Sequence, residues 1–104
     1  MKIFKLELRL YDNNTRRCQV FLERIREDHI IGGWLPPSEG RDYYSKTWSE
    51  YGISDDNLEV YLACTGYGGT AQCVVLINEA KPSKNNTVFA QSDDTRIAFK
   101  SFSI

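Results

Sequence analysis

Three cysteines and one histidine are the side chains that could ligate a metal ion or pair a nucleophile with a base: Cys18, Cys64, Cys73 and His29. A structural zinc site takes four such ligands, and no CxxC unit occurs here. Cys64 and Cys73 alternate with leucine and valine, which is typical of buried strand residues. His29 lies eleven residues from Cys18, a spacing that fits neither one helical face nor a hairpin pair. We therefore predict no metal, no cofactor and no catalytic residues, and an enzyme is the least favoured class.

The stretch from Gly32 to Gly52, GGWLPPSEGRDYYSKTWSEYG, contains both tryptophans and three of the six tyrosines. Tryptophan and tyrosine join an apolar face to one polar group, and such rings dominate binding hot spots. Pro36 and Pro37 stiffen the backbone and lower the entropy cost of presenting the neighbouring rings. A competing interpretation places these rings, Trp34 above all, over an open side of the core. The segment predicts a binding surface within residues 34–51, made of Trp34, Leu35, Arg41, Tyr43, Tyr44, Trp48 and Tyr51.

Length and charge narrow the remaining classes. A chain of 104 residues has room for one domain, residues 1–104. The 13 basic and 14 acidic residues are nearly balanced and form no basic cluster, so neither nucleic acid nor an anionic membrane is expected as a partner. The first residues, MKIFKLELRLYD, lack the apolar region of a signal peptide. We therefore expect a cytoplasmic protein whose cysteines are reduced thiols.

Residues 15–29 admit two structures. An apolar stripe at i, i+3, i+4 and i+7 predicts a helix, formed by Cys18, Phe21, Leu22 and Ile25. The alternative is a strand in which Cys18, Val20 and Leu22 face the first strand of the chain, where Phe4 to Leu10 alternate with charged residues. Two arginines at the start of this segment, Arg16 and Arg17, and two acidic residues at its end, Glu27 and Asp28, oppose the helix dipole. We predict the helix, because Phe21 and Ile25 would lie outside on the alternative.

Two hairpins are expected in the second half of the chain. Gly68 and Gly69 suit the centre of a two-residue turn, which requires positive φ. The register set by that turn places Cys64 opposite Cys73 and agrees with the apolar alternation of both flanks. A second hairpin, from Val88 to Phe99, is predicted to pair these two residues.

The predicted fold class is α+β, with a mostly antiparallel sheet of about five strands covered by one helix. The alternative is nearly all-β, with residues 15–29 as a strand. The predicted function is a non-enzymatic interaction protein, such as an inhibitor, an immunity-like protein or an accessory protein of a mobile element. Its partner is another protein or a second copy, and a homodimer is expected because the chain ends on the apolar strand from Phe102 to Ile104. The alternative is a small-ligand-binding domain whose pocket is lined by the same aromatic residues.

Overall fold

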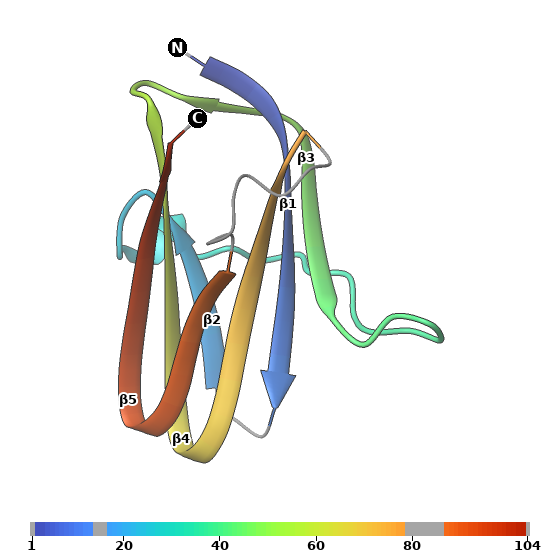
Figure 1. Cartoon of the computed structure of the whole chain (residues 1–104), viewed down its shortest axis with the longest axis vertical. Helices are drawn as coiled ribbons and strands as arrows, with labels where there is room; N and C mark the ends of the chain where they lie inside the picture. Colours follow the sequence, from blue (N-terminus) through green and yellow to red (C-terminus); the bar gives the residue numbers. More distant parts are fainter. Residues whose placement is uncertain (1, 14–16, 79–86, 104) are drawn as a thin grey trace.

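Strands make up most of the structure, a computed structural model that describes residues 2–13, 17–78 and 87–103 (Figure 1). The strands are β1 (Lys2–Asn13), β2 (Arg17–Leu22), β3 (Tyr44–Ile53), β4 (Asn57–Ile77) and β5 (Thr87–Ser103). A single 3-10 turn, η1 (Glu27–His29), is the only helical element of the described residues. The predicted α+β class is therefore wrong, and the nearly all-β alternative fits.

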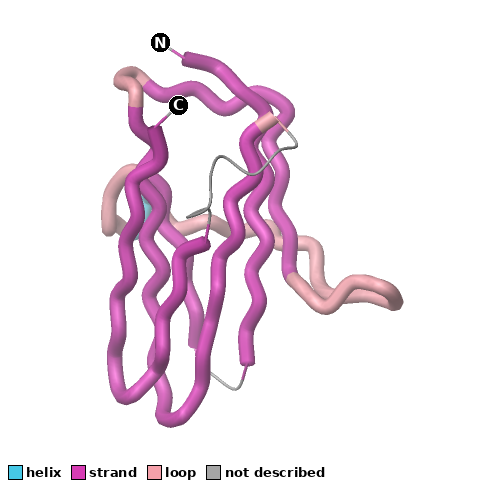
Figure 2. The backbone as a smooth tube through the Cα atoms, viewed as in Figure 1, coloured by secondary structure: helices cyan, strands magenta, loops and turns pink. Residues whose placement is uncertain are grey.

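The two longest strands, β4 and β5, pair from Asn57 to Val74 of β4 and along the whole of β5, and they fold back on themselves together (Figures 1 and 2). The first half of β4 pairs with β2 and with the second half of β5. The second half of β4 pairs with β1 and with the first half of β5, and β3 joins the far edge of β1. All of these pairs are antiparallel. The result is two sheets that share β4 and β5, with the apolar core between them.

A β-bulge lies where β4 folds back. Tyr67 pairs with Asp93 and Gly69 pairs with Ser92, so Gly68 is an extra residue on β4 with no counterpart on β5. One extra residue reverses which side chains face the core, and it bends the strand. The residues of β4 in the core cluster are even-numbered before the bulge and odd-numbered after it: Leu58, Val60, Leu62 and Cys64, then Ala71, Cys73 and Val75.

The two predicted hairpins are wrong in their pairing. Cys64 and Cys73 lie in the two different halves of β4, which belong to different sheets, so they are not neighbours in one sheet. Val88 pairs with Cys73, and Phe99 pairs with Tyr61. The physical reason is that β4 and β5, paired and bent together, bury the same alternating side chains that two separate hairpins would bury. Alternation and a glycine pair therefore locate the reversal of β4 without showing how the two arms meet.

Strand β2 corrects the helix prediction. Val20 and Leu22 are 1% and 3% exposed and lie in register with residues of β4. Phe21, on the other side of β2, is also buried, and its neighbours in register are Tyr61 of β4 and Ile30 of the following segment. Ile25 is 49% exposed. Phe21 is therefore buried on a strand as well, and Ile25 is left in solvent.

Candidate functional site

Three of the seven predicted surface residues pack against the core: Trp34, Trp48 and Tyr51. The Trp34 indole Nε1 donates a hydrogen bond to the Ile31 carbonyl oxygen at 3.1 Å, so its polar group is satisfied within the protein. The ring centroids of Trp48 and Tyr51 lie 5.5 Å apart in an edge-on arrangement, and Tyr51 lies 5.8 Å from Phe4 of β1. These partly buried rings border the core between the sheets, as in the competing interpretation of the segment.

The adjacent residues Tyr43 and Tyr44 lie on opposite sides of the β1–β3 sheet. Tyr44 pairs with the buried Leu10, so it lies on the core side of the sheet, at its edge, and is 39% exposed. Tyr43 lies beside Tyr11, which follows Leu10 and therefore faces outward, with a centroid separation of 5.3 Å. Residues 34–51 therefore contribute to both faces of the β1–β3 sheet and do not form a single binding surface.

The outer face of the β1–β3 sheet carries a group of residues that we term the Arg–Tyr surface: Arg9, Tyr11, Leu35, Arg41 and Tyr43. Two guanidinium groups lie near the Tyr43 ring, with the Cζ atoms of Arg9 and Arg41 at 4.9 and 5.7 Å from its centroid. Such cation–π contacts are worth ~0.5–1 kcal/mol each at exposed sites. Arg9 and Tyr11, which come from β1, are the members that sequence reasoning missed. The alternating charges of β1 gave no reason to separate them from an ordinary solvated face.

Both arginines of this surface are held in place by hydrogen bonds. Arg9 Nε donates to a carboxylate oxygen of Glu7, and this bond raises the pKa of the guanidinium above its ordinary value. Arg41 donates to the Pro36 carbonyl oxygen at 2.7 Å and to the Ser45 hydroxyl oxygen at 3.5 Å. The Arg41 Nε atom is buried without a hydrogen-bond partner among the described residues. The surface therefore presents its two cations in fixed positions.

The segment before β3 is an ordered extension of the sheet. Backbone hydrogen bonds join Leu35 to Ser45 at 2.8 and 3.0 Å and Ser38 to Arg41 at 3.0 and 2.8 Å. Gly40, with φ +80°, supplies the left-handed residue at the tip. Figure 1 shows this segment extending away from the two sheets. Because Ser45 also pairs with Arg9, Leu35 falls in the same row on the outer face, and its side chain is 59% exposed.

A cleft of about 370 Å³ lies beside the Arg–Tyr surface. It is lined by Tyr11, Asp12, Asp42, Thr70 and Gln72. Its lining is mostly polar and includes none of the seven residues predicted from the sequence.

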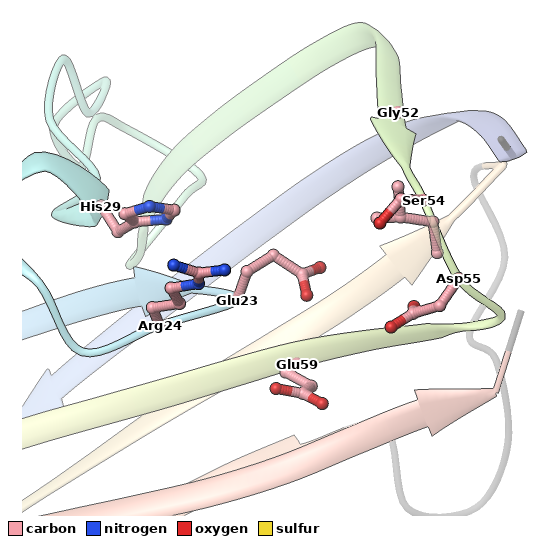
Figure 3. A pocket seen from close by; sticks show the side chains of 8 residues that line it. Glu23, Arg24, His29, Gly52, Ser54, Asp55 and Glu59 are labelled. Atoms are coloured by element: carbon pink, nitrogen blue, oxygen red, sulfur yellow. The ribbon is translucent and has the colours of Figure 1, made fainter.

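A second cleft, of about 680 Å³, lies where the end of β2 meets the turn between β3 and β4 (Figure 3). Its lining consists of Glu23, Arg24, His29, Gly52, Ile53, Ser54, Asp55 and Glu59. His29 is fixed by a hydrogen bond between its Nδ1 and the Leu22 carbonyl oxygen at 2.9 Å. Sequence reasoning assigned no site to His29 or to Asp55. The pairing of β2 with β4 brings them into one cleft, and no motif spacing could have signalled it.

Glu23 is the most perturbed group of this second cleft. Its backbone is left-handed, with φ +73°, and its N–H donates to the Glu59 carbonyl oxygen at 2.8 Å. One carboxylate oxygen, Oε1, is buried without a hydrogen-bond partner among the described residues. Burial is the largest cause and raises the pKa of Glu23, and a hydrogen bond with the Glu59 backbone opposes it. The nearby carboxylates of Glu59 and Asp55 also raise this pKa, and His29 lowers it slightly, so the net shift is upward. Figure 3 shows the Glu23 side chain extending toward the part of the cleft bordered by Asp55 and Glu59.

Glu23→Gln should stabilise the protein at pH 7. A raised folded-state pKa means that the contribution of Glu23 to stability is greatest below its ordinary pKa of 4.5 and is lost as the pH rises through the raised value. A neutral glutamine avoids that loss, and because part of the side chain reaches solvent we expect a gain of about 1 kcal/mol. Urea unfolding at pH 4 and pH 7 measures it. The exposed Glu27→Gln is the control, and an equal gain for both variants would contradict the burial argument.

The described residues contain no helix with the length and apolar character that a membrane span requires. Within them, no group of three or more histidine, cysteine or acidic side chains is arranged to hold a metal ion. Comparisons of the chain with protein-family models, with curated proteins and with solved structures give no match.

Proposed function

We propose that this protein is a non-enzymatic interaction module that binds a protein partner through the Arg–Tyr surface. Tyrosine and arginine are enriched at binding hot spots, where a large ring or a planar cation is covered by the partner. The observation that carries the proposal is the Tyr43 ring, partly exposed on an outer sheet face and flanked by two guanidinium groups. Trp34, Trp48 and Tyr51 support this surface from the core side instead of contacting the partner.

Order in the free protein favours this assignment. The backbone ladder between Leu35 and Ser45 and the Arg41 hydrogen bond to Pro36 fix the segment before it meets a partner. A surface that is already ordered loses less conformational entropy on binding. The exposed Leu35 adds apolar area next to the rings, in the same row as Arg9.

The proposal includes a cytoplasmic location and a protein partner, with two alternatives as outcomes of its test. A small ligand is less favoured, because the cleft beside the surface has a mostly polar lining that includes none of the predicted aromatic residues.

A second copy of the chain is favoured by a separate observation. Phe99 and Ile97 are each 52% exposed on β5, and the only strand that pairs with β5 in the described part of the chain is β4. The Phe99 ring also stacks on the Tyr61 ring of β4, with the ring centroids 4.7 Å apart.

Tyr43→Ala should weaken partner binding strongly while leaving the fold intact. The partner is first recovered by co-purification with the wild-type protein from its native host. A central hot-spot ring contributes ~2 kcal/mol or more, which corresponds to a loss of affinity of about thirtyfold. Tyr44→Ala is the matched control, because it removes the same side chain from the adjacent position on the other side of the sheet. Binding isotherms and melting temperatures of both variants make the measurement.

Equal loss of affinity in the two variants, or unfolding of Tyr43→Ala, would refute the Arg–Tyr surface. Sedimentation equilibrium of the wild-type protein distinguishes the partner class. A monomer at high concentration excludes a second copy, whereas a dimer that Tyr43→Ala leaves intact assigns self-association to another face. If small molecules rather than a protein co-purify, the ligand alternative replaces the proposal.

A further inference from the structure

Cys18 of β2 and Cys64 of β4 lie directly opposite each other in the sheet, and their Sγ atoms are 3.3 Å apart. Directly opposed residues of antiparallel strands have Cα atoms about 4.5 or 5.5 Å apart, depending on the hydrogen-bonding position. Disulfide-bonded cysteines have Cα separations of about 4.4–6.8 Å, which covers both cases. A bond between these two sulfur atoms therefore requires side-chain rotation and little movement of the backbone.

The two thiols differ in access. Cys18 is partly exposed, on a strand whose only partner strand in the described part of the chain is β4. Cys64 is fully buried, and its hydrogen bond with Cys18 together with burial holds its pKa well above the ordinary value. Cys73 is also fully buried, burial raises its pKa to about 12, and its partners in register are Leu10 and Val88. Cys18 is thus the thiol that a reagent reaches first, and Cys64 is the thiol beside it.

We propose that Cys18 and Cys64 form a redox-active pair that a low-molecular-weight disulfide of the glutathione type converts into a cross-strand disulfide. The Cys18 thiolate attacks one sulfur of the small disulfide, whose S–S bond breaks and releases one small thiol. The Cys64 sulfur then attacks Cys18 Sγ, the mixed disulfide breaks, and the proton of Cys64 passes to the second small thiol that leaves. Two protein thiols are oxidised, and one small disulfide is reduced to two thiols.

The sheet geometry makes this bond reversible. Opposed residues in a sheet have Cβ atoms about 4.5–5.5 Å apart, whereas disulfides prefer about 3.5–4.5 Å. The difference strains the bond and makes it easier to reduce than an unstrained structural disulfide. Oxidation would tie β2 covalently to β4 and leave the Arg–Tyr surface, which lies on the other sheet, unchanged. The inference is therefore independent of the proposed partner.

The test uses the Cys73→Ala variant, in which Cys18 and Cys64 are the only thiols. After treatment with oxidised glutathione and alkylation of the remaining thiols, the intact mass should fall by two hydrogen atoms, with no alkyl group added. Peptide mapping should show residues 18 and 64 cross-linked. The melting temperature should rise by roughly 10 °C, because the bond closes a long loop in the unfolded chain, and dithiothreitol should reverse the rise.

Three results would overturn the proposal: a glutathione adduct that persists on Cys18, alkylation of both thiols, or a disulfide between two molecules. Cys18→Ala should show no change in melting temperature with the oxidant, and a rise in that variant would assign the effect to another cause. Peptide mapping of the oxidised wild-type protein gives the same answer without the Cys73 substitution. It therefore covers the case in which Cys73→Ala does not fold.

Discussion

Val20→Asp is expected to unfold the protein, whereas Ile25→Asp is expected to leave it folded. Val20 is 1% exposed and pairs with Leu62 at the centre of the core, so a carboxylate there has no partner and no water. Burying an unpaired charge costs several kcal/mol even when the group takes up a proton, a large part of a total stability of ~5–15 kcal/mol. Ile25 is 49% exposed, and its replacement should change stability by about 0.5 kcal/mol or less.

This pair of variants separates the strand from the helix that the apolar stripe indicated. On a helix Ile25 would face the core and Val20 would lie off the stripe, so the order of the two effects would be reversed. Far-UV circular dichroism and urea unfolding of both proteins make the comparison. Unfolding of Ile25→Asp with a folded Val20→Asp would restore the helix.

Deletion of Gly68 is expected to prevent folding. Without the extra residue of the bulge, the alternation of one half of β4 would shift by one residue relative to the other half. The side chains of that half that now face the core would then face solvent. Either the set from Leu58 to Cys64 or the set from Ala71 to Val75 would then point into solvent. Each fully buried valine or leucine contributes ~1.5–3 kcal/mol, so turning out one set removes most of the stability of a domain.

The control for this deletion is a glycine inserted between Asp55 and Asp56, in the exposed turn that joins β3 to β4. It changes the chain length by the same amount without altering the facing of any strand. Soluble yield and the dispersion of amide NMR signals report the fold of each variant. A well-dispersed spectrum from the Gly68 deletion would show that the bulge is not what sets the facing of β4.

The sequence predicted a strand wherever one face of that strand is buried, because buried and exposed residues then alternate. The alternation from Phe4 to Leu10 predicted β1, and the alternation on both sides of Gly68 predicted the two arms of β4. What alternation does not contain is the identity of the neighbouring strand. A strand shows the same apolar alternation whether the neighbouring strand is hydrogen-bonded to it or packs against it from the other sheet. The predicted pairing of Cys64 with Cys73 was wrong for this reason.

Residues 17–22 could not be assigned because their burial depends on distant segments. Leu22 is buried on a strand as it would be on a helix. Phe21 lies beside Tyr61 of β4 and Ile30 in the sheet, and no local pattern reveals these neighbours. The candidate site shows the same limit. The sequence drew attention to the segment around Tyr43, but its division between core and outer face follows from β-strand geometry, and Arg9 comes from a strand more than thirty residues earlier.

The passage of β4 and β5 through both sheets has a consequence for how the protein comes apart. In a fold whose sheets are built from separate strands, one sheet can open while the other keeps its hydrogen bonds. Here β4 and β5 contribute hydrogen-bonded ladders to both sheets, so opening either sheet strains the shared bend and exposes the apolar face of the other. The two layers are therefore bound into one cooperative unit, and amide hydrogens in both should exchange through the same global opening.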